Sequence, residues 1–236
     1  MISRASLIAL LGRTRFDIHL GAASGEYERA VELCQWATRV AGALHSQLLF
    51  VEIAVRNAMD RELRTWNADR GSGPDWTSPH ATGDPLYSLL RAPLTTARRR
   101  SHGETDRRSR SGRPGPPTPE HDDVVSRLTF GAWVGLLHAT SDPTRQSLLW
   151  SEALHRAFPL APRDDASRVA LGHQLETLRR LRNRVAHHDD LLDVALPHRL
   201  NDMLSILGRI DAAYPSFAAA SGELRRLHRE DPRRGW

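Results

Sequence analysis

Three side chains that could act on a phosphodiester lie close together in the last quarter of the chain. Arg182, Asn183 and His187 fall within little more than one helical turn, inside the run RRLRNRVAHHDDLL at residues 179–192. An arginine can hold a phosphate through two parallel hydrogen bonds and offset the charge that develops on it. A histidine can accept or donate a proton because its ordinary pKa lies near neutrality. Asn183 and His187 are four residues apart, so a helix would place both on one face beside Arg182.

Two charged residues occur where apolar stripes would place core side chains. The stripe of the helix expected at residues 165–188 reaches Arg182, and that of the helix expected at residues 26–66 reaches Glu52. An isolated charge in an apolar seam costs on the order of several kcal/mol. We therefore expect Glu52 and Arg182 to meet, with Arg56, one turn after Glu52, able to share the pair. The same spacing would arise if both residues lay at the edge of their seams, and an ion pair can also be purely structural.

The neighbours of the motif allow further interpretations. His188 points about 100° away from His187 around a helix and is expected to be a solvated or capping residue that supports the site. His187, His188, Asp189 and Asp190 are all metal-ligand types, but adjacent residues on a helix do not converge on one ion. We therefore expect neither a metal nor a cofactor. Cys34 is the only cysteine, which excludes an internal disulfide and favours a small core side chain.

The composition favours an anionic partner. The chain has 236 residues and a net charge of +5, and all 33 basic residues are arginines. Arginine matches phosphate oxygens in pairs and stacks on bases, although a composition bias of the source genome explains the absence of lysine equally well. No stretch approaches the roughly 18 apolar residues of a membrane span, and the N-terminal apolar patch is too short for a secretory leader. We expect a cytoplasmic protein without a membrane partner.

The hydropathy pattern predicts an all-α protein, because no alternating strand pattern of useful length is found. Gly42 could break the first long helix, and Pro93 would kink or split a later one. Helices are expected at residues 26–66, 87–100 and 124–138, from Asp142-Pro143 to about 158, from 164 or 165 to about 188, from 197 onward, and at 217–228.

Residues 101–123 interrupt the helical pattern. They combine arginines with Ser, Gly and four prolines, and such a stretch cannot bury enough apolar surface to offset chain entropy. We expect a mobile, disordered insertion within a helical domain at residues 26–215. An N-terminal extension (1–25) and a C-terminal helix with an arginine-rich tail (216–236) flank this domain.

Five arginines are candidates for weak contacts to a nucleic-acid backbone. The alternative for those in the insertion is an ordinary solvated loop. They are Arg107, Arg108 and Arg110 in the insertion, and Arg225 and Arg226 near the C-terminus.

Three segments, in this order, resemble the Abi-like (abortive infection) family of the HEPN superfamily. They are FVEIAVRN at residues 50–57, LTFGAWVGLL at 128–137 and LRNRVAHHDDLL at 181–192. The similarity spans about residues 27–210, without the insertion at 101–123. One departure is Asp189, where the family pattern favours glutamate.

The resemblance implies a HEPN-like helical bundle that forms a homodimer, with the two Arg/His motifs facing each other across the interface. It also implies a metal-independent endoribonuclease of a phage-defence or toxin–antitoxin system, with RNA as substrate and an antitoxin or small RNA as a further partner. Arg182 and His187 would be the catalytic pair, Asn183 their polar helper and Glu52 the supporting acid. Two alternatives stay open: a non-catalytic RNA-binding protein that keeps the motif for folding or for holding a small RNA, and a structural interaction module.

Overall fold

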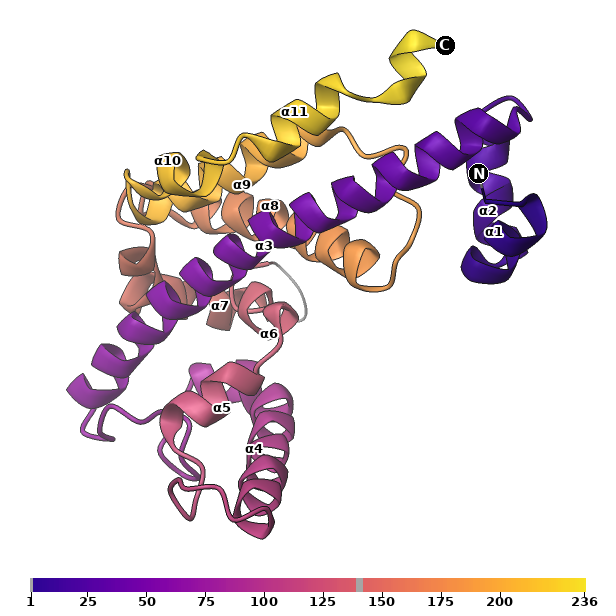
Figure 1. Ribbon diagram of the computed structural model, residues 1–236. Coiled ribbons are helices and arrows are strands. Elements are labelled where there is room, and N and C mark those ends of the chain that lie inside the picture. The colour runs from indigo at the N-terminus through magenta and orange to yellow at the C-terminus, as the bar shows by residue number, and fades with distance from the viewer. Residues whose placement is uncertain (1, 139–141) are drawn as a thin grey trace. The chain divides into compact units, whose positions relative to one another are not determined.

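The computed structural model describes residues 2–138 and 142–236, and every regular element in these ranges is a helix (Figure 1). The predicted all-α class is confirmed for this part of the chain. The elements are α1 (Arg4–Leu11), α2 (Arg13–Ala22), α3 (Tyr27–Asp69), α4 (Leu86–Arg110), α5 (His121–Arg127), α6 (Phe130–Val134), α7 (Pro143–Glu152), η1 (Leu154–Ala157), α8 (Asp165–Ala186), α9 (Leu196–Ile210), α10 (Tyr214–Ala219), α11 (Glu223–Arg229) and η2 (Pro232–Gly235).

The chain divides into two compact units. Unit 1 comprises Met1–Phe50, Arg180–Ser205 and Pro215–Trp236, and unit 2 comprises Val51–Arg179 and Ile206–Tyr214. Helices α3, α8 and α9 each contribute residues to both units. This grouping places the two terminal segments in one unit, whereas the sequence suggested that they flank a central domain.

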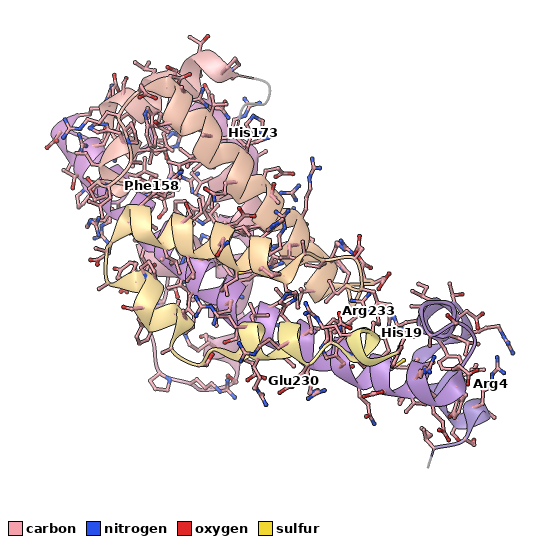
Figure 2. The ribbon with its side chains drawn as sticks, turned by 90° about the horizontal axis from the view of Figure 1, so that it is seen from above. Arg4, His19, Phe158, His173, Glu230 and Arg233 are labelled. Atoms are coloured by element: carbon pink, nitrogen blue, oxygen red, sulfur yellow. The ribbon has the colours of Figure 1, made fainter. Side chains whose placement is uncertain are left out.

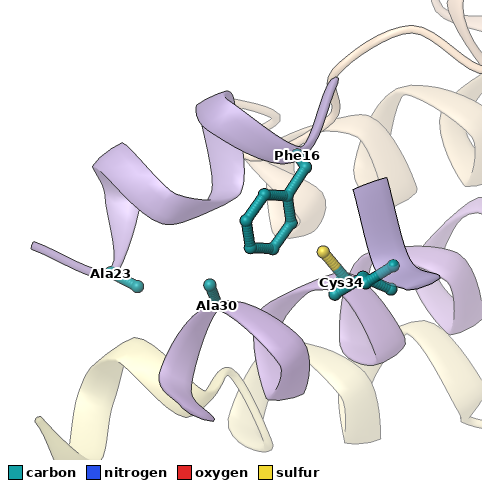
Figure 3. Close-up of a cluster of buried hydrophobic side chains, with 5 residues drawn as sticks. Phe16, Ala23, Ala30 and Cys34 are labelled. Carbon is teal, nitrogen blue, oxygen red and sulfur yellow. The ribbon is translucent and has the colours of Figure 1, made fainter. Parts of the chain in front are cut away.

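The N-terminal part of unit 1 is folded, and α1 and α2 pack on the first turns of α3. Phe16, Ala23, Ala30 and Cys34 are buried together with Leu7 in this small core (Figure 3). The hydroxyl of Tyr27 donates a hydrogen bond to the carbonyl of Ile2 at 2.7 Å and ties the start of the chain to α3. The segment at residues 4–22 therefore has its own hydrophobic contacts.

The C-terminal helices of unit 1 pack on α3 further along the helix, at Trp36 and Gln47. The indole nitrogen of Trp36 donates to the carbonyl of Leu227 at 2.9 Å, and the amide of Gln47 donates to the carbonyl of Ala218 at 2.8 Å. The expected single helix at residues 217–228 is wrong. It is divided into α10 and α11 around Gly222, whose φ of 60° lies in the left-handed region that favours glycine.

Unit 2 has a core centred on two tryptophans. Trp76 and Trp133 are fully buried, and their rings meet edge to face with centroids 6.0 Å apart. The guanidinium of Arg168, only 1% exposed, binds Asp165 at 2.6 Å and the carbonyl of Leu137 at 2.7 Å. Arg168 is therefore a structural residue that fixes the start of α8 to the chain after α6.

The expected disordered insertion at residues 101–123 is wrong for its first ten residues, which extend α4 to Arg110. Ser101 and Thr105 are buried, and the Ser101 hydroxyl donates to the carbonyl of Asp123 at 3.0 Å. Arginine is a good helix former, and small residues at three- and four-residue spacing continue the buried stripe of α4. The irregular segment is limited to residues 111–120, and Pro93 does not split the helix.

The remaining helix boundaries follow from local capping. Helix α3 runs unbroken through Gly42. The expected helix at residues 124–138 is two helices, because Leu128 is extended and the Thr129 side chain caps α6. Helix α7 begins at Pro143 as predicted, and the Asp142 carboxylate accepts the backbone N–H of Arg145 at 3.0 Å.

Candidate functional site

The motif occupies the last turns of α8. Asp164 starts this helix by accepting the backbone N–H of Ser167 at 2.7 Å. At the other end, the backbone N–H of His187 donates to the carbonyl of Asn183 at 2.9 Å. The helical register therefore continues to His187. The side chains of Asn183 and His187 leave the backbone on the same face, one helical turn apart. Arg182 and Asn183 are half-buried, and His187 is exposed.

A sharp turn follows directly after His187. His188 has a φ of 56°, the left-handed conformation that usually belongs to glycine at a helix end. Its backbone N–H donates to the carbonyl of Val185 at 3.2 Å, and that of Asp189 donates to the carbonyl of Arg184 at 2.9 Å. These two bonds form a Schellman motif, so the capping interpretation of His188 holds for its backbone. The helix expected to reach His188 ends at Ala186.

Two guanidinium groups hold the segment after this turn. Arg184 donates to Asp193 at 2.6 Å and to the carbonyl of Asp190, and its hydrogen bond lowers the pKa of Asp193. Arg233, labelled on the C-terminal segment in Figure 2, donates to the carbonyl of Leu192 at 2.9 Å. A carboxylate 2.7 Å away, that of Asp231, raises the pKa of Arg233. Sequence reasoning missed both arginines, because Leu192 lies 41 residues before Arg233, and the partners of Arg184, six and nine residues away, lie beyond the helix end where helical spacing no longer applies.

The two charges predicted inside apolar seams lie at the edges of those seams. The buried positions are Val51, with no exposed surface, and Leu181, 5% exposed, while Glu52 and Arg182 are half-buried. Their predicted core placement is wrong, because each stripe shifts by one residue toward an apolar neighbour. Glu52 and Arg182 each take part in an interaction, and their pairing with each other stays a prediction. Arg56 is half-buried too, with its Nε 3.5 Å from Asn57 Oδ1.

A cavity of about 630 Å³ in unit 1 borders the turn after the motif. This volume falls within the range of small-molecule sites, roughly 300–1,000 Å³. Its polar lining combines cationic, carboxylate and hydroxyl groups, and burial raises the pKa of the Cys34 thiol on its wall. The charged and polar lining residues are Arg13, Thr14, Arg15, His19, Thr38, His188, Asp189 and Asp190.

Most of the arginines predicted to touch nucleic acid have local partners. In the insertion, Arg107 pairs with Glu104 at 3.2 Å. Arg108 and Arg110 donate to the carbonyls of Pro116 and Asp106 at 2.9 and 3.2 Å. In α11, Arg226 pairs with Glu223 at 2.8 Å and with Glu230 at 3.6 Å. Arg225 forms no ion pair with any described residue.

Unit 2 contains a charged network that sequence reasoning did not find. The His121 ring lies between two carboxylates, with Nδ1 2.8 Å from Asp75 Oδ1 and Nε2 2.9 Å from Asp60 Oδ1. Burial opposes the charge on His121, but the two carboxylates outweigh it and raise its pKa. Burial also opposes the charge on Asp75, yet hydrogen bonds from Ser78, Thr77 and His121 hold its pKa well below the ordinary value. The three partners lie far apart in the chain, so no spacing could have revealed them.

Within residues 2–138 and 142–236, no three His, Cys, Asp or Glu side chains gather in a way that could hold a metal ion. In the same ranges, no helix has the length and apolar character needed to cross a bilayer. Comparison with protein-family models, with curated proteins and with solved structures finds no match to this chain.

Proposed function

We propose that this protein is a metal-independent endoribonuclease that cleaves RNA through Arg182, Asn183 and His187 and works as a homodimer. The proposal rests on the sequence resemblance to Abi-like HEPN proteins. One structural observation carries it further. The imidazole of His187 is exposed at the end of α8, one turn after Asn183, on a backbone that the Schellman turn and two arginines hold in place.

This arrangement suits a reaction in which RNA supplies its own nucleophile. One His187 would remove the proton of a ribose 2′-hydroxyl, whose oxygen then attacks the adjacent phosphorus. The bond from phosphorus to the 5′-oxygen breaks, and that oxygen receives a proton from an imidazolium. The products are a 2′,3′-cyclic phosphate, which water can open to a 3′-phosphate, and a 5′-hydroxyl. Arg182 would offset charge on the phosphate, and Asn183 would orient the phosphate or the histidine.

The homodimer follows from the proton count. The reaction needs a base and an acid in the same site, and each chain offers one histidine at the motif. Two chains related by a twofold axis would supply both imidazoles and two guanidinium groups. The resemblance further suggests a role in phage defence or in a toxin–antitoxin system, where an antitoxin or a small RNA would restrain the activity until it is needed.

The proposal is tested with the purified 236-residue chain, single-stranded RNA and an excess of EDTA. We expect EDTA-resistant cleavage with 5′-hydroxyl ends, and a fall of about 100-fold or more in rate for His187→Ala, because positioned acid–base groups contribute about 10²–10⁴-fold. The matched control is His198→Ala, which removes an exposed histidine of the same unit and should leave the rate unchanged.

Two results would overturn the proposal. Cleavage that survives in a normally folded His187→Ala variant would remove His187 from the reaction. Tight RNA binding by the unaltered chain with no cleavage would favour the alternative of a non-catalytic RNA-binding protein.

A further inference from the structure

A second hollow in unit 1, of about 270 Å³, lies between α9 and α11. Its basic side chains come from α11, and the exposed Pro197 at the start of α9 lies beside them. No acidic residue lines it. The lining residues are Leu196, Pro197, Leu200, Asn201, Leu224, Arg225, His228 and Arg229; we call this hollow the α9–α11 groove.

The charges around the groove are unevenly neutralised. Among the acidic residues of the C-terminal segment, Glu223 and Glu230 bind Arg226, and Asp231 binds Arg233. Arg225 and Arg229, by contrast, form no ion pair with any residue that the structure describes, and both are exposed.

A further cation lies at the edge of this surface. The guanidinium of Arg234 is 2.9 Å from the His228 ring nitrogen Nε2, so positive charge extends from α11 toward the end of the chain. Arg225 and Arg229 are one helical turn apart, which brings their Cβ atoms within about 5–6 Å of each other on one face. Two guanidinium groups at this spacing can bind neighbouring phosphates of one strand.

We propose that the α9–α11 groove binds the backbone of single-stranded RNA, through Arg225 and Arg229, away from the residues that cleave it. This inference rests on the proposed function for the nature of the ligand. Charge complementarity supports it, because a polyanion meets the guanidinium groups of Arg225 and Arg229 and no carboxylate in the groove. Pro197 is exposed beside the arginines, above the buried Leu196 and Leu200, and its ring gives an unpaired base or ribose a place to pack that a duplex would not use.

The test measures fluorescence anisotropy of a labelled 12-nucleotide oligouridylate with the 236-residue chain carrying His187→Ala, so that the RNA stays intact. Arg225→Ala is compared with Arg226→Ala in that background. Both variants lose the same charge from neighbouring positions of one helix. We expect Kd to rise about fivefold to tenfold for Arg225→Ala and less than about twofold for Arg226→Ala. We also expect the double variant Arg225→Ala/Arg229→Ala to reduce the slope of log Kd against log salt by about 1.4, or 0.7 per lost phosphate contact.

The outcomes separate the groove from the nuclease. Equal effects of Arg225→Ala and Arg226→Ala, or no measurable RNA binding by any variant, overturn the proposal that the groove binds RNA. If Arg225→Ala selectively loses affinity and the unaltered chain never cleaves RNA, the groove is supported as an RNA-binding site and the proposed nuclease activity is rejected. Stronger binding to anionic phospholipid vesicles than to RNA, with the same dependence on Arg225, would assign the groove to a membrane surface and overturn the inference. Circular dichroism confirms that each variant keeps its helical content.

Discussion

At the scale of single residues, His188 shows how the motif ends its helix. Glycine adopts the left-handed conformation without cost, and Gly71 does so after α3, with a φ of 80°. His188 occupies the equivalent position after α8, although a side chain with a Cβ atom makes this conformation unfavourable. Its side chain also lines the larger cavity of unit 1. The position therefore combines local strain with a place beside the candidate site.

We expect His188→Gly to raise the free energy of unfolding by about 0.5–1 kcal/mol. Glycine removes the strain of the left-handed conformation, and the greater conformational entropy of glycine in the unfolded chain offsets part of this gain. Urea denaturation followed by circular dichroism measures the change. His45→Gly, at an exposed position inside α3, should lower stability by about the same amount. A loss of stability in His188→Gly would show that the imidazole itself holds the turn.

At the scale of the elements, two glycines inside helices have opposite surroundings. A Cβ atom on Gly172 of α8 would lie 2.6 Å from the Cα of His138, so the backbones of α8 and of the chain after α6 pass too close for any side chain. A Cβ atom on Gly42 of α3 would meet nothing within 4 Å. Gly172 is thus required by packing, whereas Gly42 only weakens its helix.

Substitution by alanine should separate the two cases. Gly172→Ala is expected to lower the free energy of unfolding by about 1–3 kcal/mol, because backbone atoms cannot make room easily. Gly42→Ala is expected to raise it by about 0.5–1 kcal/mol through helix propensity. Thermal and urea unfolding of both variants provide the measurement. A neutral Gly172→Ala would contradict the close approach of α8 to His138.

The element scale also shows what the sequence could and could not predict. The starts of α7 and α8 were predictable, because Asp142, Pro143 and Asp164 are local signals that act on nearby backbone N–H groups. The helix formed by the first ten residues of the insertion, 101–110, was not predictable. Its buried positions are Ser101 and Thr105, which a search for apolar residues does not count. For the site, helical spacing placed Asn183 and His187 on one face. The anchors were not predictable, because Arg184 bonds across a non-helical turn to Asp190 and Asp193, and Arg233 bonds to Leu192, 41 residues earlier.

At the scale of the whole molecule, folding gives three distant carboxylate and imidazole groups a common role. His121 joins Asp60 of α3 and Asp75 of the following loop to the first turn of α5. The Trp76 indole also donates to Asp60 at 2.8 Å. Folding raises the pKa of His121 and so favours its charged form more than the unfolded chain does, which ties the stability of unit 2 to pH.

We expect the free energy of unfolding to be greatest between about pH 4 and pH 6.5. The pKa of His121 is raised above its ordinary 6.5, so its contribution is complete below that pH and disappears as pH rises through the folded value. The pKa of Asp75 is lowered from its ordinary 3.8, so its contribution is present above that pH and disappears on acidification. Urea denaturation at pH values below, within and above this range measures both the loss of stability on acidification and the loss at higher pH.

The matched variant is His121→Asn, which cannot take up the proton. Its stability should decline less than that of the unaltered chain between about pH 6.5 and pH 8.5. Identical slopes for the two proteins in that interval would exclude His121 as the source of the pH dependence.

The buried thiol of Cys34 allows the opening rate of the N-terminal helices to be measured. Because the chain has a single cysteine, 8% exposed against α1 and α2, a thiol-specific reagent reports how often those helices separate from α3. The raised pKa leaves little reactive thiolate at neutral pH, so alkaline conditions isolate the opening step. The alkylation rate, followed by intact-protein mass spectrometry, then measures the rate of local unfolding. Any molecule that fills the neighbouring cavity should slow this alkylation.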